Sequence, residues 1–131
     1  MLLCVGAINT FLIQKKLRGY VSINVQSGEA LDTHSFATLI GVGATTVNPY
    51  LAFDSLYQRY QKKLFGQFSF DECIHRYIKS VNSGLLKIMS KMGISVLSSY
   101  RGGCNFETVG LSRTVVNDYF PGVISKISGI G

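Results

Sequence analysis

The side chains that could act as nucleophiles or bases are few and are scattered along this sequence. A nucleophilic site needs a base beside a serine or cysteine, and the two imidazoles, His34 and His75, stand in no recognisable motif. Paired carboxylates for acid–base catalysis would have to come from Glu29, Asp32, Asp54, Asp71, Glu72, Glu107 and Asp118. Those acids that stand at predicted helix starts are explained as caps, because the helix dipole favours negative charge there. We therefore predict no catalytic residue in this chain.

The three cysteines lie far apart in the sequence. Cys4, Cys73 and Cys104 are separated by 69 and 31 positions, so neither a C-x-x-C metal knuckle nor a redox pair is present. An odd number of cysteines without a secretory signal indicates a reducing compartment. We predict no metal ligand and a cytoplasmic location.

Phosphate-binding and nucleic-acid-binding patterns are weak. The Gly41-Val42-Gly43 run lacks the third glycine of a dinucleotide fingerprint and follows a predicted helix instead of a strand. We predict no cofactor-binding residue.

Thirteen Lys and Arg residues against seven Asp and Glu give a net charge of +6. The basic residues stand opposite apolar stripes, which favours solvated helix faces over RNA or DNA binding. A small basic nucleic-acid-binding module stays as an alternative, and its affinity should fall steeply with salt.

Length and composition exclude several classes of protein. A chain of 131 residues has room for one domain or two half-sized pieces, and not for a multi-domain enzyme. With 47% hydrophobic and 15% charged residues, most of the chain cannot be intrinsically disordered. The apolar stretch 1–13 precedes its positive residues and is shorter than the roughly 20 residues of a membrane helix. A packed helix is therefore expected there, and no membrane contact.

The first half of the chain has the order helix, strand, helix, strand, helix. The hydrophobic pattern predicts a helix over 2–17 that stops at Gly19, a strand over 20–25, a helix from the cap Asp32 through Ile40, a strand over 44–47 and a helix over 51–64. Short strands separated by crossover helices are typical of a parallel α/β layer. Two strands alone leave faces and edges open, so this half resembles a slice of a larger layer.

The second half is predicted to be mostly helical. Ser69 and Glu72 have the spacing of a capping box, with the serine oxygen accepting from the Glu72 N–H and the glutamate reaching back. One apolar stripe follows, made of Ile74, Ile78, Val81, Leu85, Ile88 and Met92. Gly84 inside this helix indicates a close helix contact.

Beyond Gly93 the elements are short. We expect a strand over 94–97, a helical turn over 105–109 and a last helix capped by Ser112 or Leu111 that runs through Tyr119. The apolar run 123–127 has no turn or cap to end it. We place a domain boundary after residue 66, and the predicted fold class is α/β: a partial layer with short parallel strands and crossover helices, followed by a mostly helical segment.

Short motifs along the whole chain occur in the order of one known enzyme family. They include Val5-Gly6-Ala7, Gly28-Glu29-Ala30 with His34, Leu39-Ile40-Gly41, Asn48 to Phe53, Gly84 to Lys87, Met89 to Ser95, Ser99 to Gly102, Gly110-Leu111-Ser112 and Gly129-Ile130-Gly131. The sequence resembles the glutamate synthase large subunit. Residues 1–66 are similar to the end of its central domain, and residues 67–131 to the segment leading into its flavin-binding synthase domain.

The resemblance implies an enzyme family that adds ammonia from glutamine to 2-oxoglutarate and reduces the imine through FMN and a 3Fe–4S cluster. The family's glutamine-hydrolysing cysteine lies upstream of the matched part, and its flavin barrel and cluster cysteines lie downstream. A barrel of that kind takes at least about 200 residues, which this chain cannot hold. The three cysteines here equal the cluster's ligand count, but none falls in the matching part of the family.

Departures from the family pattern fall on polar positions. This chain has Asn9-Thr10-Phe11, Gln26, Leu31, Ser35 and Gly103-Cys104-Asn105 where other residues are usual in the family. The apolar stripes are kept. This pattern is expected of a chain that retains the packing of the family but has lost its activity. We interpret the chain as a fragment of the large subunit that is not catalytic alone. It could instead be an interaction piece of a split enzyme, docking onto the remaining glutamate synthase domains or onto itself.

Overall fold

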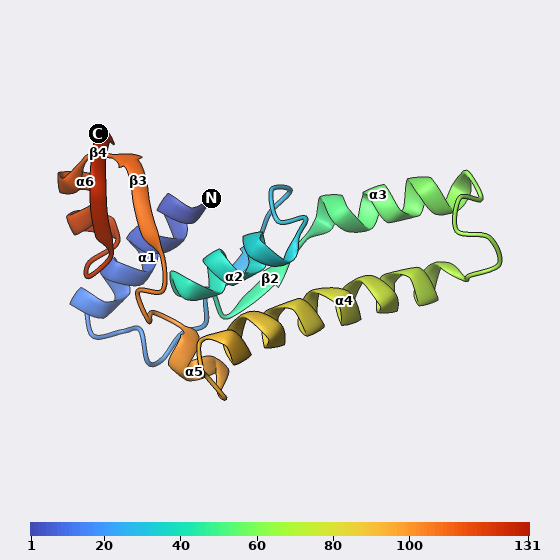
Figure 1. Cartoon of the computed structure of the whole chain (residues 1–131), viewed down its shortest axis with the longest axis horizontal. Coiled ribbons are helices and arrows are strands. Elements are labelled where there is room, and N and C mark those ends of the chain that lie inside the picture. The colour runs from blue at the N-terminus through green and yellow to red at the C-terminus, as the bar shows by residue number, and fades with distance from the viewer.

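The computed structural model describes all residues from 1 to 131, and its elements form an elongated molecule (Figure 1). The first half contains α1 (Leu2–Gln14), β1 (Asn24–Gln26), α2 (Thr33–Gly41), β2 (Thr46–Asn48) and α3 (Tyr50–Gln61). The second half contains α4 (Phe70–Lys91), α5 (Leu97–Tyr100), β3 (Glu107–Leu111), α6 (Arg113–Tyr119) and β4 (Ile124–Ile130). None of the helices combines the length and the apolar character that a membrane crossing requires.

The predicted α/β class with parallel strands is confirmed. β1 and β2 pair in parallel, with Val25 opposite Val47, and α2 forms the crossover between them. Val25 is buried and Val47 half-buried, whereas the four other side chains of the two strands are exposed. One face of this small sheet therefore faces the core, and the other faces solvent.

The end of α1 differs from the prediction. The helix stops at Gln14, and the residue with the left-handed backbone is Lys16, at φ 59°, instead of Gly19. The Leu12 carbonyl accepts from the backbone N–H groups of both Leu17 and Arg18, at 2.8 and 3.2 Å. These bonds satisfy a carbonyl of the last helical turn and end the helix before the predicted stop.

Two predictions in the second half are wrong. Residues 94–96 form no strand, and the short helix α5 begins at Leu97. The expected helical turn over 105–109 is instead the start of β3, which pairs in parallel with β4. β4 includes the apolar run that had no predicted end. β3 depends on a partner that comes after α6 in the sequence, so its local residue pattern could not show it.

The main hydrophobic core joins the two halves of the chain. Val5, Ile23, Val25, Phe36 and Leu39 pack in one cluster, and Val81 of α4 belongs to the same cluster. The predicted boundary after residue 66 falls in the loop between α3 and α4, and core packing continues across it.

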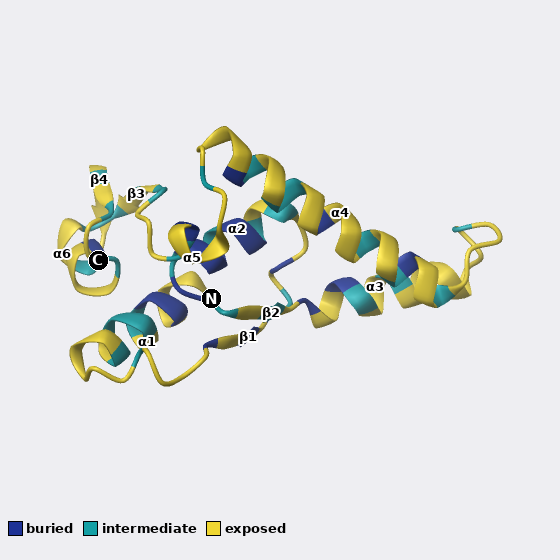
Figure 2. Cartoon of the chain, turned by 90° about the horizontal axis from the view of Figure 1, so that it is seen from below, coloured by how far each residue is buried: buried dark blue, intermediate teal, exposed yellow.

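The α3–α4 hairpin projects away from this core (Figure 1). Near its tip, the rings of Tyr57 and Phe70 meet edge to face, with their centroids 5.3 Å apart. Most of the hairpin surface is exposed (Figure 2). The only buried residues along α3 and α4 are Ala52, Cys73, Val81 and Met89.

Candidate functional site

The carboxylates at the helix starts serve those helices. Asp32 is the N-cap of α2, and its Oδ1 accepts from the Ser35 backbone N–H at 2.8 Å and from the Ser35 hydroxyl at 2.7 Å. The Ser35 N–H is the main reason why the pKa of Asp32 lies below its usual value of 3.8. A carboxylate stabilised in its charged form and pointed at a helix end is a cap, not a general acid.

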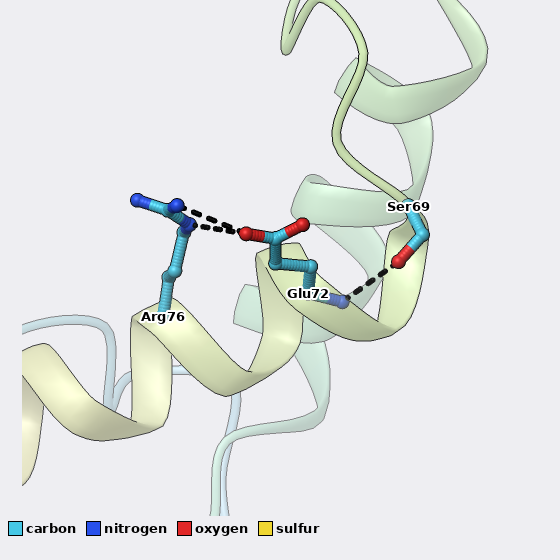
Figure 3. Close-up of polar contacts among 3 residues, drawn as sticks. All are labelled: Ser69, Glu72 and Arg76. Carbon is cyan, nitrogen blue, oxygen red and sulfur yellow. Dashed lines mark hydrogen bonds and ion pairs between the residues drawn. The ribbon is translucent and has the colours of Figure 1, made fainter.

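The capping box at the start of α4 is half formed. The Ser69 hydroxyl accepts from the Glu72 backbone N–H at 3.2 Å, as predicted. The Glu72 carboxylate does not reach back, and its Oε1 instead accepts from Nε and Nη2 of Arg76, at 3.1 and 2.9 Å (Figure 3). Arg76 lies one turn along the helix, where a cation can pair with the glutamate, and it also stacks over the Phe68 ring.

The remaining acids do not gather. Glu29 pairs with the amino group of Met1 at 3.2 Å, and Glu107 on β3 pairs with Lys126 on β4 at 2.6 Å. Asp54, Asp71 and Asp118 are exposed on α3, α4 and α6, and each lies on a different helix without an ion pair. No hydrogen bond joins two carboxyl groups, and four of the seven acids are used in a cap or in ion pairs.

The histidines and cysteines also stand apart. His34 is exposed on α2 and His75 is exposed on α4. Cys73 is buried in the first turn of α4, Cys4 is exposed on α1, and Cys104 is exposed before β3 with its sulfur 3.7 Å from the Pro121 carbonyl oxygen. Nowhere do three His, Cys, Asp or Glu side chains come close enough to hold a metal ion. The residues present do not fit the iron–sulfur cluster that the resemblance implies for the family.

The glycine run 41–43 takes part in packing. Gly43 has φ 126°, and a Cβ on it would lie 2.6 Å from the side chain of Asn9 on α1. Arg18 donates from Nη2 to the Gly43 carbonyl at 2.8 Å and from Nε to Asn9 Oδ1 at 2.7 Å. Arg18 was predicted to be a solvated basic residue, but its guanidinium joins the segment after α1 to the turn after α2.

The most apolar hollow is a groove of about 440 Å³ between β2, α2, α3 and α4. Nine of its thirteen lining residues are hydrophobic and none is charged, with Phe36, Phe53 and Tyr77 as the aromatic ones. Phe53 and Tyr77 meet edge to face at 5.9 Å, and the Tyr77 hydroxyl donates to the Leu31 carbonyl at 3.1 Å. Without an Arg or Lys, this groove does not fit the phosphate of FMN.

This groove could not be predicted from the sequence. Its lining comes from five separate elements and the segments that join them, and each of those residues looks like ordinary core in its own helix or strand. The one prediction that bears on the groove is that two strands alone leave faces and edges of the small sheet open.

The basic residues of α4 are exposed in the structure. Lys79, Lys87 and Lys91 make no ion pair, and Arg76 is held by Glu72. No aromatic ring of the chain other than Phe11 and Phe68 lies under a Lys or Arg side chain. Arrays of basic side chains interleaved with stacking rings are typical of single-strand nucleic-acid binders, and this surface does not provide one.

Comparison with known proteins gives a consistent result. The family model described as the glutamate synthase central domain matches residues 1–112. The chain is 55% identical, over 99% of its length, to the large chain of an NADPH glutamate synthase from Azospirillum brasilense, and covers 9% of that protein. It is 48% identical over 98% of its length to the corresponding large chain of Bacillus subtilis strain 168, covering 8% of it. It is 43% identical over 99% of its length to the chloroplastic ferredoxin-dependent glutamate synthase of Spinacia oleracea, covering 9% of it. The chain thus spans less than a tenth of the length of these curated relatives.

Proposed function

Because this chain belongs to the glutamate synthase family, we propose that it is a scaffolding segment of a large chain whose enzyme forms glutamate from glutamine and 2-oxoglutarate. The observation that carries this proposal is the match of 99% of the chain to 9% of the length of a relative. Because the match extends over nearly the whole chain, we expect this chain to pack as the matching stretch does in that relative. Four of its seven acidic side chains form a helix cap or surface ion pairs.

The catalytic groups of the proposed enzyme belong to other parts of the large chain. In this proposal FMN and the 3Fe–4S cluster are held elsewhere, and no residue of this chain is assigned to either. Residues 1–66 are proposed as the end of the central domain, and residues 67–131 as the segment leading into the synthase domain. That division stays a prediction, as does the cytoplasmic location, which rests on the three free cysteines.

The partner in this proposal is the rest of a large chain. Several large hydrophobic side chains are exposed on β4, α1 and α3, among them Ile130 at 85% exposure. Exposed apolar area of this kind marks an interaction surface. The chain therefore acts either as part of one continuous large chain or as a separate piece that docks onto the remaining domains.

A complementation experiment tests the proposal. The large chain of Azospirillum brasilense is prepared without the stretch that matches this chain, and the purified chain is then added. We expect no flavin absorbance and no glutamate formation from the chain alone, and glutamate formation from glutamine, 2-oxoglutarate and a reductant after mixing. Flavin binding with turnover by the chain alone, or a failure to form any complex, would refute the proposal.

Two variants of α4 control this experiment. Val81→Asp places a charge in the core cluster and should abolish complementation, because an unpaired buried charge is costly. Ser83→Asp adds the same charge at an exposed position of the same helix and should complement like the unmodified chain.

A further inference from the structure

One edge of β2 has no partner in this chain. The Thr46 N–H donates to the Ile23 carbonyl, and the Asn48 carbonyl accepts from the Ser27 N–H at 3.1 Å, so both residues point their backbone groups at β1. The backbone N–H and C=O groups of successive residues in a strand point to opposite edges of that strand. The N–H and C=O of Val47 therefore point away from β1, and no turn, loop or side chain bonds either group.

The apolar groove lies along this open edge. Thr45, Val47 and Asn48 line it, and no residue of β1 does. Its facing walls are built by Phe36 and Ile40 of α2 and by Val81 and Leu85 of α4. Because β2 and not β1 contributes to the lining, the groove lies on the side of β2 where a further strand would pair.

We infer that the free edge of β2 receives a third strand from the remainder of a glutamate synthase large chain, with the apolar side chains of that strand filling the groove between α2 and α4. This inference rests on the proposed function and names the place where the remainder attaches. Unpaired backbone groups beside an apolar groove are the features used for strand addition, because the backbone bonds bind and the groove selects alternate side chains.

The uncharged lining of the groove indicates which kind of ligand it can bind. With no charged lining residue, it disfavours an acidic or basic segment and a phosphate-bearing ligand, and it fits an uncharged, extended polypeptide. The Azospirillum brasilense and Bacillus subtilis relatives are each more than ten times longer than this chain, so more than nine-tenths of such a large chain is available to supply the strand. A two-stranded parallel sheet also needs further strands or covering layers to be stable.

Hydrogen exchange resolved to single residues tests the inference without relying on complementation. We expect the Val47 amide to exchange freely in this chain alone. The aligned amide in the intact Azospirillum brasilense large chain should exchange roughly tenfold or more slowly, since a paired amide must open before it exchanges. Fast exchange in both proteins would overturn the inference. Slow exchange in this chain alone would also overturn it, and concentration dependence of that slow exchange would identify a second copy as the occupant.

Proline variants separate the two edges of β2. Val47→Pro removes an N–H that bonds nothing in this chain, so the Ser27 amide should stay protected while affinity for the Azospirillum brasilense large chain lacking the matching stretch falls roughly tenfold or more. Thr46→Pro removes the N–H that bonds Ile23, and should expose the Ser27 amide. Unchanged affinity of Val47→Pro would refute strand addition. If the unmodified chain also fails to bind, the proposed function fails, and the exchange measurement still decides whether the edge is paired in the relative.

Discussion

Asp32 stabilises the start of α2 through its charged carboxylate. Asp32→Ala removes the acceptor for the Ser35 N–H, and we expect a loss of about 0.5–2 kcal/mol in the free energy of unfolding at pH 7. The pKa of Asp32 is lowered in the folded state, so its stabilisation is complete above the unfolded value near 3.8 and is lost as the pH falls through the lower folded value.

Urea unfolding at several pH values, followed by circular dichroism, measures this effect. The difference between the unmodified chain and Asp32→Ala should shrink below pH 3.8. Asp54→Ala, at an exposed position without an ion pair, is the matched control and should change little. A difference that stays constant down to acid pH would show that the charge of the carboxylate is not involved.

Tyr100 carries a hydroxyl that the fold does not use. The residue is 1% exposed and its hydroxyl has no hydrogen-bond partner, so burial raises the pKa of Tyr100 above its usual value of 10.0. We expect Tyr100→Phe to leave the free energy of unfolding at pH 7 unchanged or raised by about 1 kcal/mol, because an unsatisfied buried group is removed.

The same variant should alter alkaline stability. A raised folded pKa means that the contribution of Tyr100 is complete below the unfolded value of 10.0 and is lost as the pH rises through the folded value. Tyr100→Phe should therefore lose less stability above pH 10 than the unmodified chain in urea unfolding. Tyr20→Phe, at 86% exposure, is the control without this effect. A clear loss of stability at pH 7 in Tyr100→Phe would contradict the prediction.

At the scale of elements, the packing of α2 against α4 depends on Gly84. A Cβ at this position would lie 2.6 Å from Cγ2 and Oγ1 of Thr33, so the predicted close helix contact is confirmed. Alanine usually stabilises a helix by about 1 kcal/mol over glycine, but overpacking of a close contact costs about 1–3 kcal/mol. We expect Gly84→Ala to lower the midpoint of urea unfolding and to weaken the α2–α4 contact.

A second substitution shows where the cost arises. Thr33→Ala in the Gly84→Ala background removes both clashing atoms and should recover most of the lost stability. Gly19→Ala, where a Cβ meets nothing within 4 Å, should be neutral or slightly stabilising. A Gly84→Ala variant more stable than the unmodified chain would refute the close-packing interpretation.

At the scale of the whole molecule, the isolated chain lacks a closed core. Only 20 of 131 residues are buried, and large hydrophobic side chains are exposed on the β3–β4 sheet and on α1. We expect marginal stability, a broad thermal transition and concentration-dependent association, because exposed apolar surface and open strand edges favour contacts between copies. Calorimetry and sedimentation at several protein concentrations test this. A sharp cooperative melt of a monodisperse monomer would contradict it.

Elements whose signals are local could be predicted from the residues alone. Asp32, Ser69 and Ser112 cap α2, α4 and α6 as predicted, since a cap and its helix lie within a few residues of each other. The parallel order of β1 and β2 followed from the helix between them, and the family followed from the order of short motifs.

Features that join distant segments depend on the fold of the complete chain. β3 forms where a helical turn was predicted, because β4 pairs with it after α6 has intervened. Glu72 turns to Arg76 and not to the Ser69 N–H, and Arg18 binds Asn9 and the Gly43 carbonyl. The groove beside Val47 is lined by residues of β2, α2, α3, α4 and α5, which only the folded chain brings together. Local residue patterns specify the path of the backbone over a few turns, whereas strand pairing, side-chain partners and cavities depend on which surfaces the complete chain brings together.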